Sequence, residues 1–187
     1  QAMSEFVWVV FPWESEVGPE DSMSRVLEYV GEDPTREGLL ETPVRYLRGL
    51  KEMTSGYADD PVEILSKRFE QEGANYDSMV VVSGMKFWSL CEHHLLPFHG
   101  TATIGYIPGD DGKIVGLSKL ARLTHCFARR LQVQERLTEQ IANAIEENLS
   151  PKGVGVTIKA RHQCMEARGC RTAGVTVTNC LLGHFRD

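Results

Sequence analysis

Two groups of metal-ligating side chains, far apart along the chain, constrain the fold more than any other feature. The first is Cys91-Glu92-His93-His94 and the second is His162-Gln163-Cys164. The spacing of Cys91 and His94 allows a sulfur and a ring nitrogen to reach one metal ion, and zinc prefers such ligands. With Cys164 as the third ligand, the fold must bring both segments together.

The number of protein ligands decides what such a site can do. Three ligands leave the fourth zinc position open, as in catalytic sites, whereas Cys170 as a fourth ligand would close the site and make it structural. We expect the open site because His93 and His162 lie beside the ligands, and histidine carries protons near neutral pH. The alternatives are a closed site, buried cysteines without a metal, or histidines that only orient the ligands, with Glu92 as a hydrogen-bonding carboxylate.

The intervening sequence predicts strands on both sides of helices. Residues 118–149 carry apolar side chains at helical spacing, with a bend at Gln132. Strand patterns occupy residues 79–82, 101–107, 154–160 and 175–180. We expect the first two strands to pair, with the Cys91 segment crossing between them. Strands, then two long helical stretches, then strands again predict an α+β fold with an antiparallel sheet.

The N-terminal third predicts helices outside that sheet. Residues 22–30 form a helix that Gly31 ends, and residues 42–56 form another with Thr42 as its N-cap. The expected organisation is an irregular arm at 1–20, a helical extension at 21–60 and a catalytic domain at 61–187, with the last two in one globular unit. The arm carries the aromatic residues Phe6, Trp8, Phe11 and Trp13.

Composition excludes several classes of protein. The 187 residues suit one domain, and the five cysteines are odd in number and scattered, which indicates a reducing, cytoplasmic setting. No apolar run approaches the ~20 residues of a membrane span. Residues 1–33 carry eight acids and one base, so the rest of the chain is close to neutral and does not oppose an anionic substrate. No basic stripe with interleaved aromatic residues supports nucleic-acid binding.

Three further segments carry candidate substrate-binding residues. Ser118 resembles an N-cap, and Lys119 and Arg122 follow in the first turn, where cations are disfavoured unless an anion binds. Glu135 suits the N–H and amino-group edge of a base such as guanine, and Arg168, soon after Cys164, could clamp phosphate. For each, the alternative is an ordinary solvated side chain.

Together these residues resemble the GTP cyclohydrolase I family. The matching stretches are GEDPTREGLLETPVR (31–45), CEHHLLPFHG (91–100), GLSKLAR (116–122), LQVQERLTEQIA (131–142) and RHQCMEARG (161–169). The resemblance implies the tunnelling fold, an antiparallel sheet with helices on one face, assembled into toroids, usually a homodecamer with active sites at subunit interfaces. Val44 departs from the basic residue common at that position, and residues 6–13 match nothing in the family.

The resemblance also implies roles for individual residues. Cys91, His94 and Cys164 correspond to the ligands of one zinc ion per chain, and His93, His162 and Ser118 to catalytic residues. The residues that correspond to contacts with GTP are Glu135 and Gln134 for the guanine, and Lys119, Arg122, Arg168 and Arg45, with Ser118, for the ribose or triphosphate.

The implied reaction is hydrolytic opening of the guanine imidazole ring, with release of C8 as formate and rearrangement to 7,8-dihydroneopterin triphosphate, the first step of pterin and folate biosynthesis. His162 protonates N7 in this scheme, and His93 and Ser118 carry protons when the ribose opens. Two alternatives are a related tunnelling-fold enzyme that acts on another purine or pterin-like substrate, and a non-catalytic, zinc-stabilised binding module.

Overall fold

The computed structural model describes residues 17–69, 78–112 and 114–186, and the chain divides into two compact units, residues 1–51 and 52–187. Residues 6–13 of the expected aromatic arm lie outside the described residues. The expected domain boundaries at residues 20 and 60 stay predictions.

The N-terminal unit is helical. Helix α1 spans Pro19–Tyr29, with Pro19 in its first turn, and the chain leaves it through Gly31 at a φ of 91°. A short 3-10 helix, η1, spans Glu37–Leu39, and α2 spans Thr42–Met53. Both predicted helices are therefore confirmed, although α1 begins earlier than expected and α2 ends earlier.

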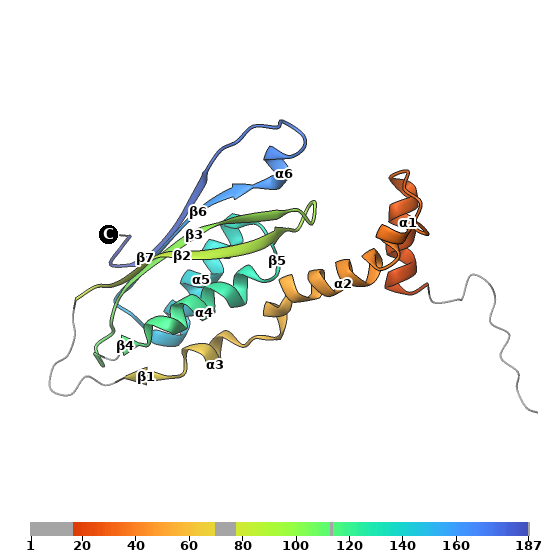
Figure 1. Ribbon diagram of the computed structural model, residues 1–187. Helices are drawn as coiled ribbons and strands as arrows, with labels where there is room; N and C mark the ends of the chain where they lie inside the picture. The colour runs from red at the N-terminus through yellow and green to blue at the C-terminus, as the bar shows by residue number, and fades with distance from the viewer. Residues whose placement is uncertain (1–16, 70–77, 113, 187) are drawn as a thin grey trace, which may run out of the picture. The chain divides into compact units, whose positions relative to one another are not determined.

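The second unit contains the sheet. Its elements are η2 (Ser55–Ala58), α3 (Pro61–Leu65), β1 (Arg68–Phe69), β2 (Val80–Cys91), β3 (Pro97–Ile107), β4 (Ile114–Val115), α4 (Leu117–Ala128), β5 (Leu131–Gln132), α5 (Gln134–Leu149), β6 (Gly153–His162), α6 (Gln163–Glu166) and β7 (Thr176–Gly183). Figure 1 shows α4 and α5 together on one side of the strands β2, β3, β6 and β7.

The main sheet has five strands in the order β5-β2-β3-β6-β7. The four long strands pair in antiparallel fashion, as expected from the sequence. The short β5 pairs with β2 in parallel, through Leu90 with Leu131 and Cys91 with Gln132. The sheet is therefore mixed, and the expectation of a purely antiparallel sheet is wrong at this edge. Strands β1 and β4 form a separate two-stranded sheet.

The core lies between the helices and one face of the sheet. Alternate residues of the long strands, including Phe87, Ile104 and Ile158, are almost completely buried. They meet the apolar stripes of α4 and α5, where Leu123 and Ile141 are fully buried. The α+β class predicted from the periodicities is thus confirmed, and its core fixes the ends of the strands that carry the candidate site.

Two local predictions are wrong in ways that matter for the site. The Cys91 segment does not cross between strands, because β2 runs to Cys91 itself and β3 begins at Pro97, directly opposite Leu90. The segment is a tight hairpin turn. The N-cap of α4 is Gly116 and not Ser118, which lies inside the helix and is exposed.

Candidate metal centre

The turn after β2 folds the chain back on Cys91. The backbone N–H of Leu95 donates to the Cys91 carbonyl at 2.8 Å, and the N–H of Cys91 donates to the Leu96 carbonyl at 2.9 Å. Leu95 has a φ of 54°, an unfavourable left-handed conformation for a residue with a branched side chain. The closed turn places His94 beside Cys91, with the Cys91 Sγ and His94 Nδ1 atoms 3.8 Å apart.

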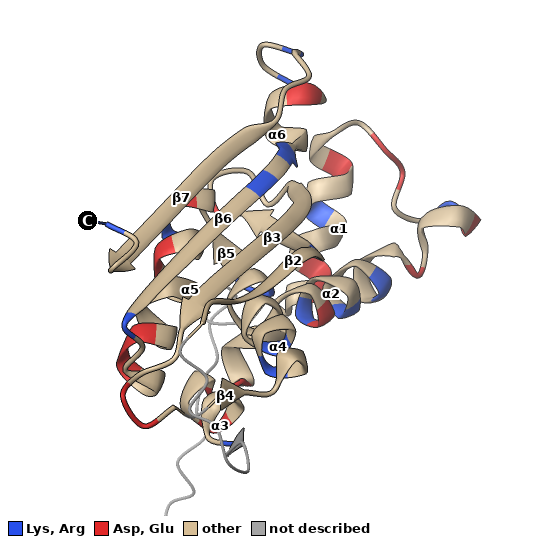
Figure 2. Ribbon diagram, turned by 90° about the vertical axis from the view of Figure 1, so that its left-hand side faces the viewer, with Lys and Arg blue, Asp and Glu red and all other residues tan. Residues whose placement is uncertain are grey.

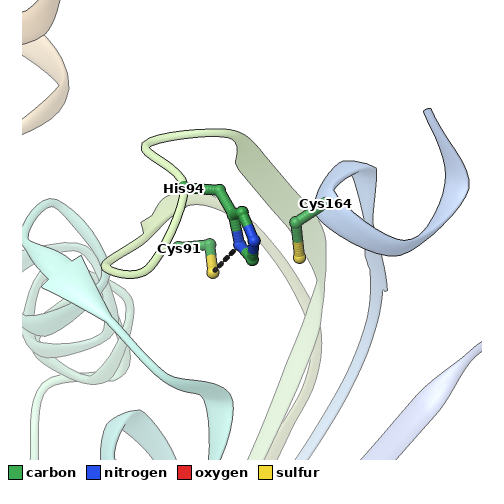
Figure 3. A group of neighbouring side chains, drawn as sticks. All are labelled: Cys91, His94 and Cys164. Carbon is green, nitrogen blue, oxygen red and sulfur yellow. Dashed lines mark hydrogen bonds between the residues drawn. The ribbon is translucent and has the colours of Figure 1, made fainter. Parts of the chain in front are cut away.

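The third candidate ligand reaches the turn through strand pairing. Strands β3 and β6 align Phe98 with His162, and the chain then enters α6, which carries Cys164. The ligand atoms of Cys91, His94 and Cys164 all lie within 4.8 Å of one another. Figure 3 shows the three side chains converging from the turn and from α6. The two segments therefore meet as the sequence analysis expects.

The donor set suits a soft or borderline metal ion. Burial raises the pKa of the Cys164 thiol, and the adjacent Cys91 raises it further. The Cys164 thiol therefore resists ionisation unless a cation lies beside it, and a divalent ion removes that obstacle. Two sulfurs and one imidazole nitrogen are ligands that zinc commonly takes.

Cys170 does not join this group among the described residues. Its side chain is exposed, and its Sγ atom lies 3.4 Å from the Met165 carbonyl oxygen. Arg168, from the same segment, does reach the group, because its Nη1 atom lies 3.0 Å from His94 Nε2.

His93 lies next to the Cys91 thiol but is not one of the three converging ligand candidates. It is exposed, and its Nδ1 atom lies 3.8 Å from the Cys91 Sγ atom. Glu92 forms an ion pair with Arg136 of α5, whose hydrogen bond holds the pKa of that carboxyl below its usual value. Arg136 also donates from Nε to Gln132 Oε1 at 3.1 Å. Sequence reasoning did not assign Arg136 to the site, because no local spacing connects it to Glu92.

His162 is held from two sides. Its ring stacks on Phe98 at a centroid distance of 4.7 Å and an interplanar angle of 7°, and its Nε2 atom lies 2.7 Å from Gln134 Oε1. Burial lowers the pKa of the imidazolium, while the carboxylates of Glu135 and Glu166 oppose that shift. The phenyl ring of Phe98 is a contact that the sequence analysis did not single out, although Phe98 belongs to the quoted 91–100 motif.

The remaining candidate residues lie elsewhere in the described structure. Lys119 and Arg122 line a cleft of about 410 Å³ together with Asp60 and Glu63. No contact with the Cys91 turn is recorded for either base among the described residues. Arg45 belongs to the N-terminal unit, where it pairs with Glu41. Figure 2 shows the blue basic segments distributed over several elements and not gathered into one stripe.

These observations first define a class of protein: an α+β protein with a thiol–imidazole group that could hold a metal ion, and two further histidines beside it. Comparison with known proteins then identifies the family within this class. The family model described as GTP cyclohydrolase I matches residues 19–187. The chain belongs to the GTP cyclohydrolase I family and is an enzyme of that family.

Curated relatives agree over most of the chain. A protein of Janthinobacterium sp. (strain Marseille) named GTP cyclohydrolase 1 is 57% identical over 87% of this chain and 81% of its own length. A protein of the same name from Chlorobium phaeovibrioides is 55% identical over 88% of this chain and 73% of its own length.

A solved structure titled as the archaeosine synthase QueF-Like in the apo form gives a TM-score of 0.43 at 16% identity, covering 55% of this chain and 92% of that one, and adds nothing to the assignment. None of the helices that the structure describes has the length and apolar character of a membrane span.

Proposed function

We propose that this protein is a zinc-dependent hydrolase that opens the guanine imidazole ring of GTP, releases C8 as formate and forms 7,8-dihydroneopterin triphosphate. One observation carries the proposal beyond family membership. Cys91, His94 and Cys164 converge as a ligand group, while His93 and His162 lie beside that group and outside it. A closed structural site would not need two additional imidazoles.

The residues present fit one zinc ion. Cys91, His94 and Cys164 would hold it, and Cys170 lies outside the group among the described residues. Three protein ligands are the number typical of catalytic zinc sites. A zinc ion held there supplies Lewis acidity and makes a water molecule acidic enough to ionise near neutral pH. We therefore propose an open, catalytic zinc site and not a closed, structural one.

The protein's own residues would bind the substrate and move protons. His162, with a pKa lowered by burial, exchanges a proton at N7 of the purine, and the exposed His93 and Ser118 serve ribose opening. Glu135 is exposed beside His162 in the first turn of α5, where its carboxylate can accept from the N–H edge of guanine. Lys119 and Arg122, in a helix start without acidic residues, suit the triphosphate, with Arg168 and Arg45.

We also propose assembly into a toroidal homo-oligomer of the tunnelling-fold type, a decamer by resemblance, with active sites shared between subunits. The outer edge of β7 has no partner strand among the described residues, and the strand carries no charged side chain that would discourage pairing. A second chain could continue the sheet there. In such an assembly, the cleft that Lys119 and Arg122 line in one subunit would lie beside the group of Cys91, His94 and Cys164 in another.

The decisive experiment incubates the metal-loaded protein with GTP and measures formate together with the fluorescent pterin that appears after oxidation. We expect both products in equal amounts. Absence of product from a metal-loaded, intact oligomer would refute the proposal, and a panel of other purine and pterin-like substrates would then test the related-enzyme alternative.

A second measurement separates proton transfer from metal binding. We expect His162→Ala to abolish formate release while the zinc content stays near one per chain, because His162 is not among the converging ligand atoms. Loss of zinc in this variant would contradict the division between ligands and proton carriers. A variant without zinc but with full stability would instead favour a misassigned ligand set.

A further inference from the structure

We propose that Gln134 is a positioning residue for His162: its side-chain oxygen holds the hydrogen on Nε2 and leaves Nδ1 as the nitrogen that faces the substrate. The inference rests on the proposed role of His162 as a proton carrier. It also gives Gln134 a different task from the direct guanine contact that the resemblance implies.

The orientation of the Gln134 amide is settled by its surroundings. The side chain is buried, and its Nε2 atom lies 3.1 Å from the Ile158 carbonyl oxygen and 3.0 Å from the Thr176 carbonyl oxygen. Carbonyl oxygens only accept hydrogen bonds, so the amide nitrogen must face them. A flipped amide would bring its oxygen against both carbonyls, which excludes the alternative assignment.

The amide orientation in turn determines the proton on His162. With its nitrogen turned toward β6 and β7, Gln134 presents Oε1 to His162 Nε2 at 2.7 Å. An amide oxygen can only accept, so Nε2 must carry the hydrogen. The neutral ring then has its lone pair on Nδ1, for which no hydrogen-bond partner is recorded among the described residues.

Phe98 completes the constraint on the ring. The phenyl ring is fully buried, and the nearly parallel stack fixes the plane of the imidazole while Gln134 fixes its rotation within that plane. The Nε2–H group is present in both the neutral and the protonated ring, so the contact to Gln134 persists when Nδ1 gains or loses a proton. Gln134 therefore orients the proton carrier without taking part in the transfer.

The same contacts leave Gln134 no free amide hydrogen for a purine. Its two hydrogens are shared among the Ile158 and Thr176 carbonyls and the Thr178 hydroxyl, whose Oγ1 atom lies 3.1 Å away. The exposed Glu135 is the neighbour that remains available to the guanine edge.

The first test needs no substrate. Magic-angle-spinning ¹⁵N NMR of the histidine-labelled, metal-loaded protein at alkaline pH reports which nitrogen of each neutral imidazole carries hydrogen, and the His162→Ala spectrum identifies the signals of His162. We expect a pyrrole-type Nε2 and a pyridine-type Nδ1. The opposite tautomer in the wild-type protein would overturn the proposal, whether or not the protein turns over GTP.

The second test compares variants that separate the contact to His162 from the contacts to the sheet. Gln134→Met removes both, and we expect kcat for GTP to fall by about 10- to 100-fold, the usual effect of removing the partner that orients a functional imidazole, with KM changed less than about 3-fold. Gln134→Glu keeps an acceptor oxygen for His162 but loses the amide donors, so we expect a kcat well above that of Gln134→Met. A purely structural role predicts no such rescue.

Thr178→Val is the matched control, because it removes an acceptor of the Gln134 amide without touching His162. We expect it to retain the wild-type tautomer and a kcat within about 3-fold of wild type. A fall in kcat equal to that of Gln134→Met, or a Gln134→Met enzyme with wild-type kcat, would overturn the proposal. If Gln134→Met does not fold, the tautomer seen in the wild-type spectrum and the kcat values of Gln134→Glu and Thr178→Val still test the proposal.

Discussion

Replacement of Gly100 by alanine tests how closely β3 and β6, the strands next to the candidate metal ligands, must approach each other. Gly100 lies on β3 opposite Ala160 of β6. A Cβ atom at this position would lie 1.9 Å from the Lys159 carbonyl oxygen and 2.7 Å from the Ala160 Cα atom. Ordinary carbon–oxygen contacts need about 3.4 Å, so the strands would have to separate by more than an ångström. Both obstructing atoms are backbone and cannot rotate away.

The expected loss of stability follows from that separation. Overpacking typically costs about 1–3 kcal/mol, and the ladder hydrogen bonds beside Gly100 contribute about 1 kcal/mol each. We therefore expect Gly100→Ala to lower the free energy of unfolding by about 3–5 kcal/mol, a large part of the ~5–15 kcal/mol available to a typical domain. The register of Phe98 with His162 lies two residues along the same pairing, so turnover of GTP should fall in the molecules that stay folded.

Gly105→Ala is the matched control on the same strand. A Cβ atom there would lie 3.5 Å from a Val81 methyl group and 3.6 Å from the Met79 sulfur atom, both ordinary contacts with side chains. Guanidinium unfolding at one fixed protein concentration gives the comparison, and we expect Gly105→Ala to stay within about 1 kcal/mol of wild type. Equal unfolding midpoints for the two variants would refute the reasoning from backbone approach.

Two further predictions concern the ligands and a histidine outside the site. X-ray absorption at the zinc edge should show two sulfur ligands, whereas three sulfurs would indicate a closed site. The Cys170→Ser variant should keep the metal, and the Cys164→Ser variant should lose most of it. Burial, and secondarily the charge of Arg129, lower the pKa of His125. Because the folded protein binds this proton less readily than the unfolded chain, stability should be complete above the unfolded pKa of about 6.5 and decline as the pH falls toward the lower folded value. The melting temperature of His125→Gln should therefore fall less than that of wild type between about pH 7 and pH 5, and parallel curves would contradict this.

The sequence predicts the parts of this molecule that depend on local pattern. Alternation and helical spacing give the α+β class because a buried face repeats every two residues in a strand and about every 3.6 residues in a helix. The spacing of Cys91 and His94 points to one metal group because a single turn can bring both side chains together. Cys164 joins them in the structure through the pairing of β3 with β6.

The contacts that the sequence does not predict depend on tertiary packing. Nothing near Glu92 in the chain indicates that Arg136 will pair with it, and nothing near His162 indicates its stack on Phe98. The expected N-cap at Ser118 is wrong because Gly116 already has the extended conformation of a cap. Serine is favoured at the N-cap position, but the path of the preceding chain decides where α4 begins.

The chain leaves the helical conformation between α4 and α5, where the sequence predicts only a bend at Gln132. This break matters for the site. The break holds β5, whose Gln132 carbonyl accepts from the Glu92 N–H at 3.0 Å, so the start of α5 is anchored to the turn that carries Cys91 and His94. Residues two apart in a helix lie about 200° apart around its axis. From this one turn, Gln134 reaches His162 at the end of β6, while Arg136 reaches Glu92 after β2. The helix start thus couples the position of the His162 ring to the position of the turn that carries Cys91 and His94.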